Sequence, residues 1–436
     1  MPSKSKTYNE AYVWIWLPDE VNPVVAGKLT QDGKSFVFNY GQSYLERPNK
    51  ISIYTPELPL KPGMLPLLGN LTIPGCIRDG SPDAWGRRVI INKKYGVTGK
   101  AIDQHQLDEL TFLLESGSDR IGALDFQTSP TEYKPRLSLH ASLDELLHSA
   151  EKVEKGIPLT QALDQALFHG SPIGGARPKA LIDHTDKKYI AKFSSTSDLF
   201  SVIKAEFIAM RLAKQAGIEV ANVRLEQSSK KDVLLIERFD RVPTKKGWQR
   251  KNMISALTIF EFDEIVDVRY TSYELLAEKI RHSFYEASKT LKELYKRLVI
   301  NILVGNTDDH ARNHAAFWDG KMLKLTPAYD ICPQPRTGGE ASQGMLIHGN
   351  NRMSQLRECI AVASHFQLSR KESMSIIEEI ANIIIDNWKE TCEESKLSEV
   401  DRKLFSSHQF FNRFAFENLE GDSQHLEKLG QKFRSF

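Results

Sequence analysis

The chain has 436 residues, 41% of them hydrophobic and 26% charged, which is the composition of a globular protein with a large core. The 58 basic residues nearly balance the 56 acidic ones, so the net charge of +2 argues against a nucleic-acid-binding surface over the whole chain. The four cysteines form no Cys-x-x-Cys pair, the polar N-terminus lacks the apolar core of a signal peptide, and no run approaches the roughly 18 apolar residues of a membrane span. We therefore expect a cytoplasmic protein with no membrane contact and no structural metal.

The first part of the chain predicts a β-rich N-terminal unit over residues 1–135. Its strand-like runs are rich in β-branched and aromatic residues, with Gly, Asp and Asn between them. They are AYVWIWL, NPVVAGKLT, SFVFNYG and ISIYT, at residues 11–17, 22–30, 35–41 and 51–55. Helices are expected at 83–96 and 106–117, and the polar, proline-containing stretch 128–138 reads as an exposed connection.

The pattern changes after about residue 165. A glycine-rich turn at 170–179 leads into two strand-like runs at 179–185 and 187–194, a helix at about 200–216 that Gly217 ends, and a buried strand at 232–240. We assign residues 136–245 to an N-lobe on this basis.

Beyond about residue 250 the chain reads as mainly helical. Apolar residues follow one another at helical spacing between Leu291 and Val304, and Ser369 with Glu372 forms a capping box for a later helix. We assign residues 246–436 to an all-helical C-lobe. The prediction is an α+β, two-lobed fold like that of a protein kinase.

The segment NTDDHARN, residues 306–313, follows the Leu291–Val304 helix and carries the strongest signal for catalysis. Four residues separate Asp308 from Asn313, as in the catalytic loop of protein kinases. One carboxylate can accept the proton of an attacking hydroxyl while an amide oxygen holds a metal on the phosphates. Asp309 fits this spacing less well. The alternative is a polar loop that simply ends a helix.

Asp330 in LTPAYDICP follows Asn313 by seventeen residues and is the expected second metal ligand. Carboxylate and amide oxygens suit Mg²⁺. Lys192, in the strand-like YIAKFS, would grip the nucleotide phosphates, and Glu206 on the next helix would steady it. The alternatives are an ordinary aspartate at a strand end and a lysine that faces solvent.

Two further segments lie where the chain order of a two-lobed phosphotransferase predicts its phosphate-binding loop and its hinge. The paired glycines of the 170–179 turn would let backbone amides approach phosphate, although Gly-Gly more often marks a plain turn. Glu237, Arg238 and Phe239 end an apolar strand where a kinase hinge would meet adenine, and otherwise form a core strand that runs into a charged turn. His310 would contact phosphate or pack within its loop.

These residues make the chain resemble the HipA family of bacterial toxin kinases over nearly its whole length. The resemblance rests on GGARPKA, YIAKF, ERFDR, TDDHARN and LTPAYD, with GSPDAWGRR and SDRIGAL upstream. It implies an ATP- and Mg²⁺-dependent serine/threonine protein kinase. Carried over by motif, Asp308 is the catalytic residue, Asn313 and Asp330 are metal ligands, and the nucleotide is bound by Gly174, Gly175, Ala176, Arg177, Pro178, Lys179, Lys192, Glu237, Arg238, Phe239, His310 and Tyr329.

The resemblance also implies partners and regulation. Family members pair with a helix-turn-helix antitoxin, HipB-like, which neutralises the kinase and carries it to operator DNA, and their protein substrates include aminoacyl-tRNA synthetases. Many carry an autophosphorylated serine before the glycine-rich loop, where this chain has Pro172. Ser171 stands next to it and is our hypothesis for the modified residue.

Two other functions remain open from the sequence. The same metal ligands occur in small-molecule kinases of this fold, and a catalytically silent chain would serve as a co-repressor scaffold for a DNA-binding antitoxin. All the expected catalytic residues are present, which favours an enzyme over the scaffold.

Overall fold

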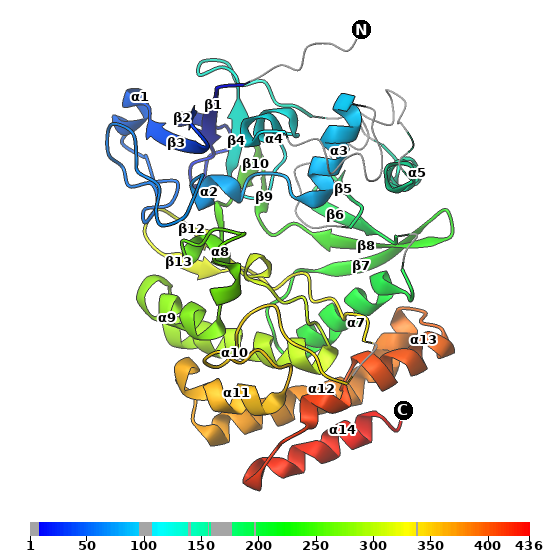
Figure 1. Cartoon of the computed structure of the whole chain (residues 1–436). Coiled ribbons are helices and arrows are strands. Elements are labelled where there is room, and N and C mark those ends of the chain that lie inside the picture. Colours follow the sequence, from blue (N-terminus) through cyan, green and yellow to red (C-terminus); the bar gives the residue numbers. More distant parts are fainter. Residues whose placement is uncertain are drawn as a thin grey trace.

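The computed structural model describes residues 8–95, 107–137, 141–155, 157, 177–195, 198–336 and 339–436. In Figure 1 the strands occupy the upper half of the molecule and the long helices the lower half. The two-lobed α+β arrangement predicted from the sequence is confirmed.

A four-stranded antiparallel sheet forms the N-terminal unit, in the order β3-β2-β1-β4. Its strands are β1 (Glu10–Ile15), β2 (Val24–Asp32), β3 (Ser35–Tyr40) and β4 (Leu124–Gln127). The first three confirm the predicted strands. The helices around this sheet and after it are α1 (Gln42–Leu45), α2 (Gly75–Arg78), α3 (Ala84–Tyr95), α4 (Glu109–Glu115) and α5 (Leu143–Glu154).

The prediction of a strand at 51–55 is wrong, because this buried segment pairs with side chains instead of a neighbouring strand. The amide of Ile53 donates to the Tyr40 hydroxyl at 2.9 Å, and its carbonyl accepts from Asn252 Nδ2 at 2.8 Å. The carbonyl of Ser52 accepts from Trp318 Nε1 at 3.0 Å. The apolar, β-branched residues of this segment therefore indicate that it is buried, not that it is a strand. Side chains from other parts of the fold supply the hydrogen bonds that a neighbouring strand would otherwise make with its backbone.

A second antiparallel sheet, in the order β5-β6-β8-β7, forms the N-lobe. Its strands are β5 (Lys179–Asp183), β6 (Lys188–Phe193), β7 (Val223–Ser228) and β8 (Lys231–Glu237), with helix α7 (Val202–Gln215) between β6 and β7 and the hairpin β9 (Arg241–Thr244) and β10 (Gly247–Arg250) after them. The strands at 179–185, 187–194 and 232–240 and the helix at 200–216 were predicted. Gly217 follows α7 with φ of 73°, the left-handed conformation that favours glycine after a helix.

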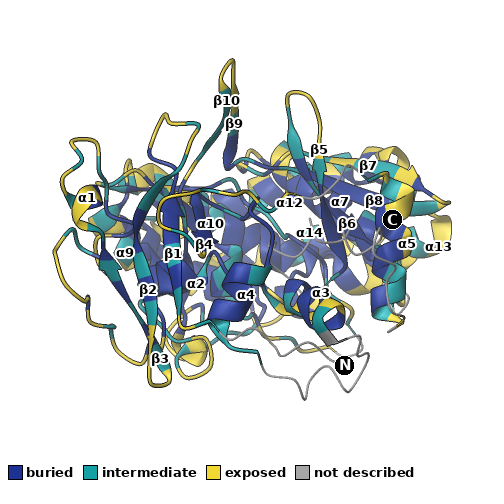
Figure 2. Ribbon diagram, turned by 90° about the horizontal axis from the view of Figure 1, so that it is seen from above, coloured by how far each residue is buried: buried dark blue, intermediate teal, exposed yellow. Residues whose placement is uncertain are grey.

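The C-terminal region is built on helix α10 (Ala287–Val304), whose residues are largely buried, and Figure 2 shows the buried interior in dark blue. The capping box of Ser369 and Glu372 opens α12 (Arg370–Glu394), as predicted. The other helices are α8 (Ala256–Ile259), α9 (Tyr273–Ser283), α11 (Leu356–Val362), α13 (Glu399–Leu404) and α14 (Glu427–Phe433). Short 3₁₀ and π turns lie at 268–270, 311–313, 363–366, 405–409, 413–416 and 421–426.

The prediction of an all-helical C-lobe needs correction. A small sheet, in the order β11-β12-β13, joins Met253–Ser255, Ala315–Trp318 and Leu323–Leu325. Each strand has only three or four residues, too few for an alternating pattern to stand out, and β11 pairs with a strand about sixty residues away. This sheet flanks the segment that carries Asp308 and Asn313.

All four cysteines are buried free thiols. None of the helices in the described part of the chain is both long and apolar enough to cross a bilayer.

Candidate active site

A cavity of about 490 Å³ brings together the residues that the sequence singled out. It is lined by Arg177, Lys179, Lys192, Glu206, Glu237, Arg238, Phe239, Asp308, His310, Asn313, Tyr329 and Asp330. Pro178 is described but is not among the lining residues. Gly174, Gly175, Ala176 and Ser171 lie outside the described residues.

Lys192 lines the cavity and forms ion pairs with two carboxylates. Its Nζ lies 2.6 Å from Glu206 Oε1 on α7 and also forms an ion pair with Asp330. Lys192 is only 7% exposed, so the interpretation of it as a solvent-facing strand lysine is wrong. Although burial acts to lower its pKa, the two carboxylates raise the pKa of Lys192 above its usual value, and the amine stays charged.

The same contacts hold Asp330 as an anion. Burial would raise its pKa, but Lys192 and Lys179 outweigh this and place the pKa of Asp330 well below its ordinary value. Burial raises the pKa of Glu206 instead. Asp330 has φ of 61°, a left-handed conformation that few residues other than glycine adopt, and such backbone positions concentrate at functional sites.

The segment with Asp308 begins where α10 ends. Gly305 has φ of 73°, and a side chain there would place Cβ 2.5 Å from the carbonyl oxygen of Gln409, so this turn requires glycine. After the turn the two neighbouring aspartates face different surroundings. Asp308 is exposed toward the cavity, whereas Asp309 is buried, accepts from the Tyr273 hydroxyl and lies 2.8 Å from His314 Nε2. Asp309 is therefore engaged within the folded loop, whereas Asp308 is exposed and lines the cavity.

The position of Asp308 also affects its ionisation. Burial and the repulsion of Asp330 and Asp309 raise the pKa of Asp308, and His310 acts against them. Asn313 donates from Nδ2 to the Asp308 carbonyl at 3.0 Å, so a cation would be met by the amide oxygen of Asn313. The residues expected to act as base and as metal ligand are thus tied together within one short loop.

Asn306 is a site residue that sequence reasoning missed. Its Nδ2 donates to Asn301 Oδ1 at 3.0 Å and reaches the Asp330 carbonyl at 3.5 Å. Asn306 is buried and lines the cavity, so it links α10 to the backbone of Asp330. Its place as the first residue of NTDDHARN was the available signal.

The hinge residues line the cavity in different ways. The backbone amide of Glu237 donates to the Asn222 carbonyl, and that of Arg238 donates to the Lys188 carbonyl, both at 2.8 Å. Because both amides already donate within the protein, neither is available to donate a hydrogen bond to adenine. Phe239 instead offers its ring, whose centre is 5.8 Å from that of Tyr329. A flat base would meet this aromatic wall, so of the three residues Phe239 fits the predicted role best.

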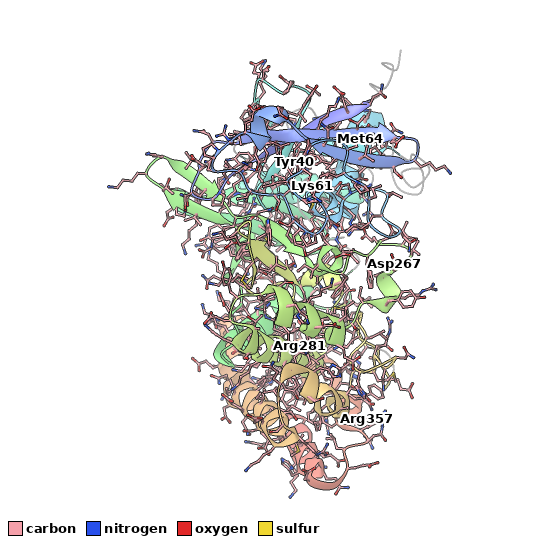
Figure 3. The ribbon with its side chains drawn as sticks, turned by 90° about the vertical axis from the view of Figure 1, so that its left-hand side faces the viewer. Tyr40, Lys61, Met64, Asp267, Arg281 and Arg357 are labelled. Carbon is pink, nitrogen blue, oxygen red and sulfur yellow. The ribbon has the colours of Figure 1, made fainter. Side chains whose placement is uncertain are left out.

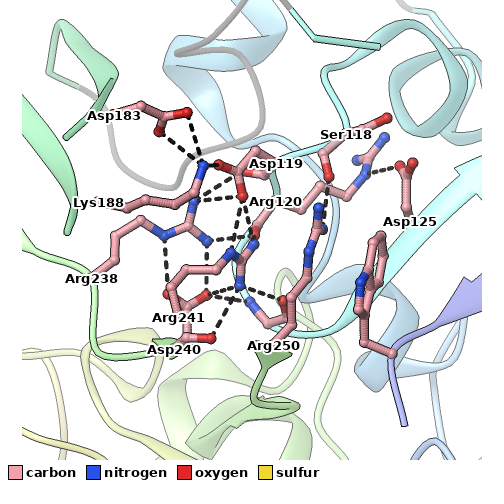
Figure 4. Close-up of polar contacts among 12 residues, drawn as sticks. Ser118, Asp119, Arg120, Asp125, Asp183, Lys188, Arg238, Asp240, Arg241 and Arg250 are labelled. Carbon is pink, nitrogen blue, oxygen red and sulfur yellow. Dashed lines mark hydrogen bonds and ion pairs between the residues drawn. The ribbon is translucent and has the colours of Figure 1, made fainter. Parts of the chain in front are cut away.

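The Arg238 side chain points into a buried ion-pair network that joins the hinge to the N-terminal unit (Figure 4). The Asp119 carboxylate forms ion pairs with three cations. The N–O distances are 3.1 Å to Arg238, 2.8 Å to Arg241 and 2.9 Å to Lys188. Asp240 binds the same two arginines at 2.8 and 2.9 Å. Both arginines and both carboxylates are almost fully buried. The motifs SDRIGAL and ERFDR therefore meet in this network.

The N-terminal unit also supplies acidic groups to the cavity. Asp79 and Asp83 line it, together with Glu264 from the segment after α8. Glu264 is paired with Arg312 at 2.7 Å, and Asp79 accepts from the amide and hydroxyl of Ser255. Within the described part of the chain, Asp83 Oδ1 is buried without a hydrogen-bond partner, and burial raises the pKa of Asp83 to about 6.

Comparisons with known proteins agree on one family. The family model described as HipA-like C-terminal domain matches residues 171–388, and the HipA N-terminal domain matches residues 16–127. A serine/threonine-protein kinase toxin HipA of Shewanella oneidensis is 26% identical over 215 residues, which cover 42% of this chain and 48% of that protein. A putative kinase of Haemophilus influenzae is 28% identical over 187 residues, 38% of this chain and 54% of that protein. The chain thus spans about half the length of these curated relatives.

A solved structure extends the likeness to the whole fold. The Shewanella oneidensis toxin–antitoxin complex of HipA, HipB and operator DNA contains a chain that matches with a TM-score of 0.68. The match covers 98% of this chain and 96% of that one at 18% identity, so it supports the fold alone. With one family model spanning half of the sequence and a second matching the N-terminal unit, the chain belongs to the HipA family.

Proposed function

We propose that this protein transfers the γ-phosphate of ATP to a serine or threonine hydroxyl of a protein and acts as the toxin of a HipA/HipB-type module. The observation that carries the proposal is the ion pair of Lys192 with Glu206 and Asp330 in the cavity that Asp308 also lines. This is the set of groups that phosphoryl transfer between two lobes requires.

Each residue has a distinct task in this proposal. Lys192 holds the nucleotide phosphates, and Glu206 keeps its amine in place. Asp308 accepts the proton of the attacking hydroxyl, and its raised pKa makes it a stronger base than an ordinary aspartate. Arg177 and Lys179 add positive charge at the end of the cavity where β5 begins.

Mg²⁺ fits the oxygen donors that line the cavity. The Asp330 carboxylate and the Asn313 amide oxygen would hold the ion, which neutralises charge on the phosphates when bound. Only two protein ligands are needed, since Mg²⁺ keeps several waters and phosphate oxygens. Among the described residues, no three or more His, Cys, Asp or Glu side chains form a cluster suited to a metal.

The partners follow from the related complex, in which HipA occurs with HipB and operator DNA. We propose that a HipB-like helix-turn-helix protein neutralises this chain and brings it to DNA. The protein substrate is then an essential cellular protein, with aminoacyl-tRNA synthetases as the first class to examine. Ser171 remains our hypothesis for autophosphorylation, which mass spectrometry after incubation with ATP would test.

The test compares Asp308→Asn with Asp186→Asn, a control at the exposed turn between β5 and β6. Wild type and both variants are incubated with radiolabelled ATP, Mg²⁺ and a bacterial lysate. We expect label in a protein band with wild type and Asp186→Asn, and at least a hundredfold less with Asp308→Asn. Label in metabolites alone would indicate a small-molecule kinase. The same variants are also expressed in bacterial cells to measure growth. If Asp308→Asn still inhibits growth, the protein acts as a scaffold without catalysis.

A further inference from the structure

Four exposed apolar side chains gather on one short segment beside the cavity. Ile265 is 89% exposed, and Val266, Val268 and Tyr270 are 49%, 38% and 54% exposed. We call these four residues the 265–270 patch. In Figure 3 the labelled Asp267, within this segment, lies at the edge of the molecule where its strand-rich and helical halves meet. Exposed apolar side chains that gather in this way commonly mark interaction sites.

The backbone below the patch is held in place, so the exposure is not that of a loose loop. Asp263 Oδ1 accepts from the amides of Ile265 and Val266 at 2.9 and 3.1 Å. Asp267 binds the Asp263 amide at 3.0 Å and Asn70 of the N-terminal unit at 3.1 Å. The Arg269 carbonyl accepts from Arg352 at 2.9 Å. The segment therefore presents its apolar side chains on a preorganised frame, which lowers the entropy lost on binding.

The patch is continuous with the candidate active site. Glu264, the residue just before it, lines the cavity and is paired with Arg312 at 2.7 Å. Asp83 lines the same cavity and keeps a buried carboxylate oxygen without a hydrogen-bond partner among the described residues. A chain that lay across the patch and passed Glu264 would enter the cavity that Asp83 and Asp308 also line.

The charge around the patch selects the partner. Residues 261–270 carry four acidic side chains, at Glu261, Asp263, Glu264 and Asp267, against one basic side chain at Arg269. Glu264 is paired with Arg312 and Glu261 with Lys279, whereas Asp263 and Asp267 accept hydrogen bonds from uncharged amide groups. A basic segment would gain from these two carboxylates, and its lysine or arginine would approach Asp83, whose buried Oδ1 has no hydrogen-bond partner among the described residues.

We infer that the 265–270 patch is the docking surface for the protein substrate. It binds the extended segment around the phosphorylated serine or threonine, with apolar residues of that segment on Ile265 and Val266 and a lysine or arginine directed at Asp83. This inference rests on the proposed kinase function and adds to it the class of sequence that the enzyme selects.

The experiment uses the full-length chain, Mg-ATP and an array of serine-centred peptides in which each flanking position is varied. Wild type should prefer peptides with Lys or Arg and with Ile, Leu or Val near the serine. The double variant Ile265→Ser/Val266→Ser should raise the KM for the best peptide about tenfold and change kcat less than twofold. The matched control is Val400→Ser, an 80% exposed residue on α13, which should leave both constants unchanged. Asp83→Asn should abolish the preference for a basic residue.

The outcomes separate this inference from the proposed function. If wild type phosphorylates no peptide and no protein in a lysate, the kinase function fails. If wild type phosphorylates peptides but the double variant keeps its KM, or shows no preference for apolar residues, only the docking surface is overturned. A change in oligomeric mass or in binding of a HipB-like protein, with an unaltered peptide KM, would assign the patch to another partner and also overturn the inference.

Discussion

Replacing Asp119 by asparagine tests how strongly the N-terminal unit is bound to the hinge. The substitution keeps the shape of the side chain and removes the negative charge that three cations share. Arg238 and Arg241, almost fully buried, would then have Asp240 as their one remaining carboxylate partner among the described residues. Removing one partner of a buried ion pair costs about 3–5 kcal/mol, so we expect a loss of about 3 kcal/mol in the free energy of unfolding.

Asp183 provides the matched control, because it binds the same Lys188 at the same 2.9 Å. Its side chain is 42% exposed, so Asp183→Asn should cost no more than about 1 kcal/mol. Urea unfolding followed by tryptophan fluorescence measures both variants. Equal losses in the two variants, or a loss below about 1 kcal/mol for Asp119→Asn, would show that water reaches the network and would refute the reasoning.

The pH dependence gives an independent check. Burial acts to raise the pKa of Asp119, but Arg238 and Arg241 outweigh it and hold that pKa well below its usual value. A carboxyl group with a lowered folded-state pKa stabilises the fold above its unfolded value of about 3.9, and that stability is lost as the pH falls toward the folded value. The difference between wild type and Asp119→Asn should therefore stay constant from pH 6 to 8 and shrink below about pH 4.

Three further results are expected. Lys192→Met should reduce phosphate transfer at least a hundredfold and raise the KM for ATP, because Asp330 and Glu206 lose their shared cation, while the control Lys245→Met, at the exposed turn between β9 and β10, keeps activity. Asn306→Ala should lower kcat more than it raises the KM for peptide, since the tie to the Asp330 carbonyl is lost; an unchanged kcat would contradict this role. Burial raises the pKa of Glu57 to about 7, so the native state holds a proton that the unfolded chain has released, and about 3 kcal/mol of stability should be lost as the pH rises from about 4.5 to 7. Glu57→Gln should flatten that profile in urea titrations.

The sequence could predict that Lys192, Asp308 and Asn313 lie together, because each belongs to a short local motif, and all three line one cavity. Lys192 was found because a lysine inside an alternating strand needs an anion, and Asp308 with Asn313 because a fixed spacing within one loop determines their geometry. The surroundings of Arg238 could not be predicted. Its partner Asp119 lies more than a hundred residues earlier, and no periodic pattern connects two charged residues across such a distance.

Contacts between residues far apart in the chain also could not be predicted for the N-terminal unit, which the sequence therefore presented as separate from the two lobes. Its sequence shows strands and turns but not that Asp79 and Asp83 would enter the cavity. Once folded, the unit contributes two carboxylates to the cavity wall, and Asp119 binds Arg238 and Arg241 on either side of Phe239. A movement of this unit would therefore displace the Phe239 ring and the carboxylates of Asp79 and Asp83 together. A partner that bound the N-terminal unit would thus change two parts of the cavity wall through one contact, and under the proposed kinase function both ATP binding and substrate access would respond.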